Sequence, residues 1–235
     1  MSFWPWGREY KPLSQASRAV LEALRATPVP ELRRPLRDVS WVVVDTESSG
    51  LDAKHDRLLS IGACTVCGGN VVIGSGFEVV LRQEQASTDH NILLHRIGGT
   101  AQLEGEDPER ALAAFLDYAR HHPLVALHAQ FDATLMARAL RDRLGLHFRA
   151  LWVDAAHVAA ALFPQAHGEN WGLDQWLAHF GIENYARHDA LADAFSTAQL
   201  FLVLLERAAS QGIPDARALI DLGRGQHELN RWLSR

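Results

Sequence analysis

The stretch Trp41-Val-Val-Val-Asp-Thr-Glu-Ser-Ser-Gly-Leu51 decides the fold. It begins with four apolar residues, three of them β-branched, as in a strand that is buried on both faces. The two serines and Gly50 that follow are typical of the turn that ends such a strand. The stretch therefore predicts a buried strand that carries two acidic residues, Asp45 and Glu47, at its end.

These two acids are placed to act together. Because side chains alternate along a strand, both carboxylates point to the same face, with their Cα atoms about 7 Å apart. Two acids that lose water and repel each other need a cation or a proton to coexist. Their hard oxygen atoms suit Mg²⁺ or Mn²⁺ better than zinc. A strand that runs out into solvent with acids at its rim is the simpler interpretation, and Asp45 and Glu47 alone do not decide between the two.

The segments around this strand predict an α/β protein. Two more strands are expected at 58–66 and 71–80, joined by the turn residues 68–70 into an antiparallel hairpin. After about residue 84, helical periodicity alternates with short apolar segments, which indicates a three-layer sandwich with a mixed central sheet flanked by helices. The later elements are expected at 108–119 (helix), 124–128 (strand) and 131–144 (helix), and the segments 154–163, 172–180 and 190–205 complete the alternating run, with a helix beginning at Ala190.

We expect one domain at residues 37–207, with an extension at each end of it. Residues 1–36 predict a helix near 14–25 and a proline-rich connector, and 208–235 predicts a C-terminal helical extension. The aromatic start (Trp4, Trp6 and Tyr10) could instead anchor the chain at a membrane surface or dock a partner. Residues 226–232 resemble a sliding-clamp-binding peptide loosely, and an amphipathic helix is the favoured interpretation.

The amino-acid composition and the net charge exclude several classes of protein. Hydrophobic residues make up 48% and charged residues 22% of the 235 residues, as in a globular protein. The net charge of −5 argues against a broad basic surface for long nucleic acid, although an enzyme that holds a few nucleotides remains compatible with it. Two cysteines cannot build a disulfide framework, and neither a signal segment nor an apolar run of about 20 residues is present. We therefore expect a cytoplasmic protein with no membrane partner.

Asp132 is a second candidate. It lies where the short strand at 124–128 leads into a helix. A carboxylate in that place either caps the helix or joins the acids of the first strand at the same edge of the sheet. Its position alone favours the cap.

His188 and Asp193 form a third candidate pair. Five helical residues turn about 140° away from one face, so the two side chains converge only if His188 lies in the loop before the helix. The polar segment 184–189 and the alanine-rich start at Ala190 agree with such a break. An imidazole titrates near neutral pH and can accept a proton from water. A polar loop that enters an amphipathic helix is the alternative.

Three motifs in order resemble the DEDDh exonuclease family. They are Asp45-Thr46-Glu47-Ser48-Ser-Gly50-Leu51, Phe131-Asp132 and His188-x4-Asp193. That family includes the epsilon proofreading subunit of bacterial replicative polymerases, RNase T and oligoribonuclease, and the resemblance covers about residues 42–205. It implies a ribonuclease H-like fold and a 3′→5′ exonuclease that releases nucleoside 5′-monophosphates from single-stranded DNA or RNA 3′ ends.

The resemblance also implies roles for the matched residues. Asp45, Glu47, Asp132 and Asp193 would hold two divalent metal ions, Mg²⁺ or Mn²⁺, with Asp45 between them. His188 would be the general base that takes a proton from the attacking water. His95-Arg-Ile97 is the nearest match to a His-Gly-Ile segment that relatives often carry near the 3′ end of the substrate. The expected substrate contacts are Thr46, Ser48, Gly50, Leu51, Phe131 and His95.

Several alternatives stay open from the sequence. DNA is the expected substrate, in a proofreading or repair enzyme that could bind a DNA polymerase. An RNA-processing exoribonuclease, a hydrolase of short oligonucleotides and a module that binds 3′ ends without cutting them are the others. The sequence leaves the oligomeric state open.

Overall fold

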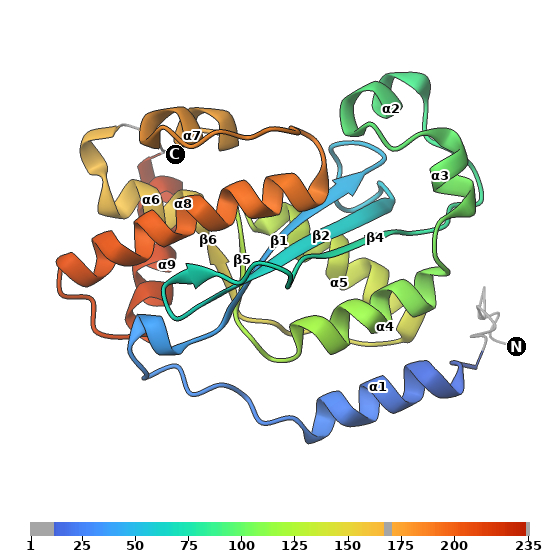
Figure 1. Cartoon of the computed structure of the whole chain (residues 1–235), viewed down its shortest axis with the longest axis horizontal. Helices are drawn as coiled ribbons and strands as arrows, with labels where there is room; N and C mark the ends of the chain where they lie inside the picture. Colours follow the sequence, from blue (N-terminus) through green and yellow to red (C-terminus); the bar gives the residue numbers. More distant parts are fainter. Residues whose placement is uncertain (1–11, 167–170, 234–235) are drawn as a thin grey trace, which may run out of the picture.

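The computed structural model describes residues 12–166 and 171–233, and it forms a mixed sheet between two layers of helices (Figure 1). The expected α/β three-layer fold is confirmed. The aromatic residues Trp4, Trp6 and Tyr10, for which a docking or anchoring role was considered, lie outside the described residues.

The sheet is built around β1. Its six strands have the order β3-β2-β1-β5-β6, and β4 pairs with β2 as well. Strands β2, β3 and β4 are connected by antiparallel pairing, whereas β1, β5 and β6 run parallel. The strands are β1 (Trp41–Ser48), β2 (Leu58–Cys67), β3 (Asn70–Val71), β4 (Phe77–Val80), β5 (Leu124–Ala126) and β6 (Trp152–Asp154).

Helices cover both faces of the sheet (Figure 1). Alternate residues of β1 enter the two cores, Trp41 and Val43 on one face and Val42 and Val44 on the other. The first face is covered by α6 (Ala155–Leu162), α7 (Leu173–Phe180), α8 (Ala190–Ser210) and α9 (Ala216–Leu233). The second is covered by α4 (Pro108–Ala119) and α5 (Gln130–Leu144), with α1 (Gln15–Ala26) packed on α4. Two short helices, α2 (Asp89–His95) and α3 (Gly99–Glu104), and the 3₁₀ turns Leu36–Asp38 and Pro164–Ala166 complete the chain.

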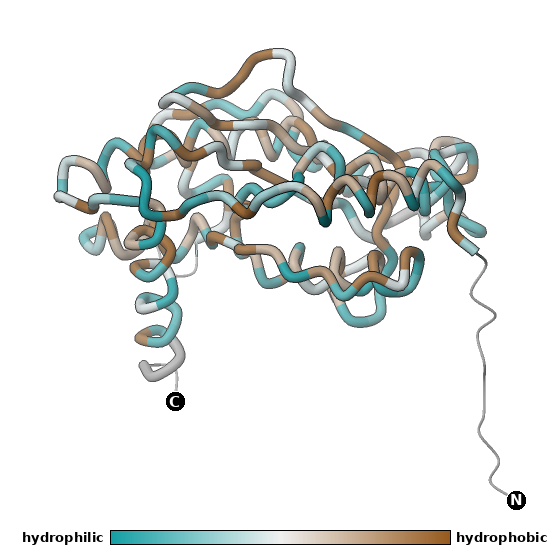
Figure 2. Tube along the Cα trace, turned by 90° about the horizontal axis from the view of Figure 1, so that it is seen from below, coloured by the Kyte–Doolittle hydropathy of each residue, from teal (hydrophilic) through white to brown (hydrophobic). Residues whose placement is uncertain are grey.

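The two terminal helices pack on the body of the protein. The helix expected near 14–25 is α1, and α9 packs against α6. Hydrophilic and hydrophobic residues alternate along α9 (Figure 2), as expected for an amphipathic helix. In the part of the chain that the structure describes, no helix has the length and apolar character needed to cross a membrane.

The expectation of one strand at 71–80 was wrong. The segment divides into β3 and β4, separated by a turn. Gly74 has a φ of +85°, which a strand does not accommodate. The Ser75 hydroxyl donates to the carbonyl of Val72 and accepts from the N–H of Thr65, so it takes the place of ladder pairing. Strand β6 and helices α2 and α3 are additions that no periodicity had indicated.

A close approach between β2 and α8 brings the first turn of that helix to the end of β1. Gly62 pairs with Asp45 across the two strands, so both face the same side of the sheet. A Cβ atom at Gly62 would lie 2.1 Å from the backbone carbon of Ala190 and 2.2 Å from the nitrogen of Leu191. Only a residue without a side chain permits this contact.

Gly62→Ala is expected to lower the free energy of unfolding by about 1–3 kcal/mol, because the added methyl group must push α8 away from β2. Gly76→Ala is the matched control, since a Cβ there would meet only the Leu191 side chain at 3.6 Å. It should change stability by less than about 0.5 kcal/mol. Urea denaturation of both variants measures the difference, and equal stabilities would show that the approach is not tight.

Candidate active site

Four acidic residues and one histidine converge at the end of β1. Asp45 and Glu47 lie on the face of the strand that α8 covers, and the first turn of α8 supplies Asp193, which is buried. The ligand atoms of Glu47, His188 and Asp193 all lie within 4.8 Å of one another, a spacing that could hold a metal ion. The structure thus brings two of the three predicted clusters together.

Asp132 reaches the same place from the other side of β1. The chain leaves β5, turns at His128 with a φ of +56°, and starts α5 at Gln130 with Ala129 as its cap residue. Asp132 therefore lies inside the first turn and is not the N-cap of the helix. Its buried carboxylate accepts a hydrogen bond of 2.6 Å from the Thr46 hydroxyl on β1. This bond ties the helix to the strand that carries the other two acids.

Burial and mutual repulsion raise the pKa values of these acids. Burial is the main cause for Asp45, whose pKa lies well above its usual value, and the charges of Asp132, Asp193 and Glu47 add to it. Burial, followed by the charge of Asp193, raises the pKa of Glu47 to about 8. Burial also raises the pKa of Asp132 to about 7, although the bond from Thr46 opposes the shift. The cluster thus holds protons that a divalent cation can replace.

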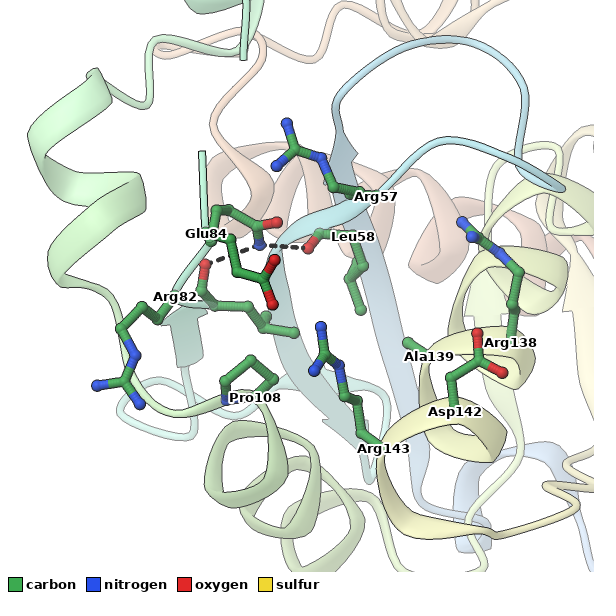
Figure 3. A pocket seen from close by; sticks show the side chains of 11 residues that line it. Arg57, Leu58, Arg82, Glu84, Pro108, Arg138, Ala139, Asp142 and Arg143 are labelled. Carbon is green, nitrogen blue, oxygen red and sulfur yellow. Dashed lines mark hydrogen bonds between the residues drawn. The ribbon is translucent and has the colours of Figure 1, made fainter. Parts of the chain in front are cut away.

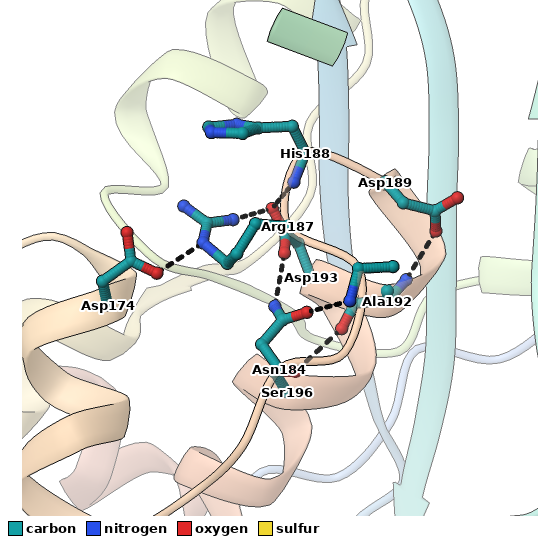
Figure 4. A network of polar contacts seen from close by, with 9 residues as sticks. Asp174, Asn184, Arg187, His188, Asp189, Ala192, Asp193 and Ser196 are labelled. Carbon is teal, nitrogen blue, oxygen red and sulfur yellow. Dashed lines mark hydrogen bonds and ion pairs between the residues drawn. The ribbon is translucent and has the colours of Figure 1, made fainter. Parts of the chain in front are cut away.

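Arg187 is a cation beside the cluster that sequence reasoning missed (Figure 4). Its guanidinium contacts Asp193 and also donates from Nε to Asp174 of α7 at 2.6 Å. The positive charge partly offsets the pKa increases of Asp45 and Glu47. The position of Arg187 beside His188 was a signal, but its pairing depends on how α7 and α8 pack.

The loop before α8 is organised around the Asp193 carboxylate (Figure 4). One oxygen accepts from the Asn184 amide at 2.5 Å, and the other accepts from the backbone N–H of His188 at 3.1 Å. His188 itself is exposed and has a φ of +64°, and Asp189 caps α8 by accepting from the N–H of Ala192. The break between loop and helix that convergence required is therefore present.

The expected substrate contacts occupy different environments. Leu51 is 96% exposed at the tip of the β1–β2 loop, and the Ser48 hydroxyl donates to the carbonyl of Gly50 at 2.5 Å. Phe131 is partly buried beside Asp132. All six contacts stay predictions.

Two of these six side chains are occupied by other residues. The Thr46 hydroxyl donates to Asp132, so any contact of Thr46 with a substrate would have to come from its backbone. His95 is buried, with its ring nitrogens bonded to the Ser87 hydroxyl and the N–H of Ile97.

Comparisons with solved structures agree with this fold. The chain superposes on Exonuclease X in complex with 5′ overhanging duplex DNA with a TM-score of 0.61, 19% identity, and coverage of 78% of this chain and 99% of that one. Escherichia coli Exonuclease I in complex with a dA16 oligonucleotide gives a TM-score of 0.62 at 17% identity, over 78% of this chain and 42% of the other. At these identities the likeness concerns the fold.

Relatives in sequence carry the names of DNA polymerase III proteins. The epsilon subunit of Aquifex aeolicus is 25% identical over 197 residues, which cover 83% of this chain and 96% of the relative. An epsilon-like protein of Rhodobacter capsulatus is 30% identical over 193 residues, or 79% of this chain and 26% of the relative. The PolC-type polymerase of Thermotoga maritima is 26% identical over 176 residues, and the chain spans only 12% of its length.

The family model for the exonuclease domain of RNase T matches residues 42–201, which include every acid of the cluster and His188. The resemblance of the three motifs is thereby confirmed. The chain belongs to the RNase T exonuclease family.

Proposed function

We propose that this protein is a metal-dependent 3′→5′ exonuclease that hydrolyses the terminal phosphodiester of single-stranded 3′ ends and releases nucleoside 5′-monophosphates. The observation that carries the proposal is the convergence of four acids with His188 at the end of β1, in a chain of the exonuclease family. A protein that only binds 3′ ends has no need for such a buried, mutually repelling cluster.

The donor set fits divalent metal ions. Asp45, Glu47, Asp132 and Asp193 offer only carboxylate oxygens, which suit Mg²⁺ or Mn²⁺. These four residues would hold two such ions. When bound, the ions activate water and stabilise charge on the attacking and leaving oxygens. Arg187 forms ion pairs with both Asp193 and Asp174, and it thereby links the carboxylate of Asp193 to α7.

His188 is placed to move a proton. Its imidazole lies next to the carboxylates of Glu47 and Asp193 but remains exposed. It can therefore take a proton from the attacking water and pass it to solvent. Leu51, at the tip of its loop, and Phe131, beside Asp132, are the side chains proposed to contact the terminal bases.

DNA is the proposed substrate, and a DNA polymerase is the proposed partner. The relatives are DNA polymerase III subunits, and the structural neighbours were solved with DNA.

The first test uses single-stranded DNA and RNA that carry a label at either end. The wild-type protein should shorten the strand from its 3′ end with Mg²⁺ or Mn²⁺ and not with EDTA, with DNA preferred over RNA. Asp45→Ala should lose activity and keep its circular dichroism spectrum, because it removes one of the carboxylates that would hold the ions. Cleavage that persists in EDTA, or that starts at the 5′ end, would contradict the proposal, and faster cleavage of RNA would shift the assignment to RNA processing.

His188→Ala should lower kcat by roughly 10²–10⁴-fold, as expected for the loss of a general base. The Mn²⁺ affinity should stay within about a factor of three of the wild-type value, because the carboxylates hold the ion. Titration of Mn²⁺ by electron paramagnetic resonance measures that affinity. A large loss of affinity would make His188 a ligand instead of the base.

The free energy of unfolding of the metal-free protein should fall as the pH rises from about 5 to about 8. The folded pKa of Glu47 is about 8 and that of Asp132 about 7, both above the unfolded values. In this window the folded state holds protons that the unfolded state has released. Each such proton lowers stability by about 1.4 kcal/mol per pH unit as the pH rises. Urea denaturation in EDTA measures the slope.

Two controls assign that slope to the cluster. Glu47→Gln should make it shallower, because the amide does not titrate. Excess Mg²⁺ should reduce or reverse it, since the ion binds the deprotonated carboxylates of the folded state. Stability that rises with pH in EDTA would contradict the pKa directions.

A further inference from the structure

Cationic side chains gather along the outer side of α5, beyond the acidic cluster. A first hollow is lined by Lys54, Arg138 and Arg141 together with the start of α5, and no acid lines it. A second hollow is lined by Arg57, Arg82, Arg138 and Arg143 and by the acids Glu84 and Asp142 (Figure 3). Arg138 lines both, so the two hollows adjoin. We call them together the α5 groove.

The α5 groove is more positive than the rest of the protein. Six cations (Lys54, Arg57, Arg82, Arg138, Arg141 and Arg143) and two acids line it, and Asp107 pairs with Arg82 at 2.8 Å, so the local balance is +3 (6 − 3) in a chain whose net charge is −5. A local excess of one sign attracts partners of the opposite sign. The low overall charge had argued against a broad basic surface, and this groove is a narrow one.

Several of these cations have bonding capacity left. The Nε atom of Arg138 is buried without a hydrogen-bond partner, and its Nη1 is 3.5 Å from the carbonyl of His55. Within residues 12–166 and 171–233, the ammonium group of Lys54 forms no ion pair. Arg141 has only an exposed contact of 3.3 Å with Asp142. An anion would satisfy these groups better than their present neighbours do.

The α5 groove starts beside the acidic cluster. Gln130 and Ala133, which flank Asp132 in the first turn of α5, line its first hollow. Arg138 and Arg141 lie roughly 9 Å and 14 Å beyond Asp132 along the helix axis, and about 120° and 180° around the helix from it. A stacked strand that rises 3.4 Å per nucleotide needs at least roughly three to four nucleotides for this span, because it must also pass around the helix.

We propose that the α5 groove binds the phosphate backbone of an extended polynucleotide strand, at least three to four nucleotides from the 3′ end held at the acidic cluster. The inference rests on the proposed exonuclease function and deepens it, because it makes long strands the substrate class and excludes a hydrolase specific for dinucleotides. Exposed arginine and lysine side chains on such a path contribute affinity that depends on salt and does not read sequence.

The test variant is the double change Lys54→Glu and Arg141→Glu, two exposed residues that contact none of the four acids. The double change Arg18→Glu and Arg149→Glu is the matched control, because it alters the same charge at exposed positions outside the groove. Both variants and the wild type are assayed with a 20-nucleotide single strand and with a dinucleotide, at several salt concentrations.

For the 20-nucleotide strand, kcat/KM of the test variant should fall at least 10-fold at low salt. The slope of log kcat/KM against log salt should become shallower by about 0.7 for each phosphate that the variant no longer neutralises. Dinucleotide hydrolysis by the test variant and both activities of the control should match the wild type. Arg138→Gln should also lower kcat/KM for the 20-nucleotide strand.

Two results would overturn the inference. One is an unchanged kcat/KM of the test variant on the 20-nucleotide strand. That result would show that the α5 groove does not bind the substrate strand and would favour a different acidic partner. The other is an equal loss on both substrates, which would place the effect at the acidic cluster or in the fold. Failure of the proposed function is distinguishable, because the wild type itself would then cleave neither substrate.

Discussion

The structure depends on one constraint: four carboxylates are held close together in a largely buried site at the end of β1. Asp45 and Asp132 approach each other across β1, and Glu47 and Asp193 meet on the face that α8 covers. Burial and like charge both oppose this arrangement, and the raised pKa values of Asp45, Glu47 and Asp132 are its direct expression. The surrounding elements therefore have to fix each acid firmly, and in the proposed function a divalent cation replaces the protons.

Three local devices hold the acids in place. Gly62 lets the first turn of α8 come against β2 directly opposite Asp45. The Thr46 hydroxyl, on the other face of β1, fixes Asp132 and with it the start of α5. Arg187 supplies a positive charge to Asp193 and links the loop before α8 to α7. The three interactions differ in kind: Gly62 allows a close backbone approach, Thr46 donates a hydrogen bond from a neutral hydroxyl, and Arg187 forms an ion pair.

Much of this site could be predicted from local patterns. The alternation of a strand places Asp45 and Glu47 on one face, and the polar loop before Ala190 allows His188 and Asp193 to converge. Asp132 remained ambiguous because the cap position depends on where α5 starts. Arg187 and the α5 groove were out of reach because their partners are brought together by packing of distant segments. The turn at Gly74 was missed because apolar residues continue on both sides of it.

The central claim is that the buried carboxylates exchange protons for a divalent ion. Calorimetric titration of the metal-free protein with Mn²⁺ near pH 7, in two buffers of different ionisation enthalpy, counts the protons released on binding. We predict saturable binding with net release of protons, reduced in Glu47→Gln, because Glu47 and Asp132 titrate at about 8 and 7 in the metal-free protein. Absence of binding, or binding with no proton release, would contradict the account.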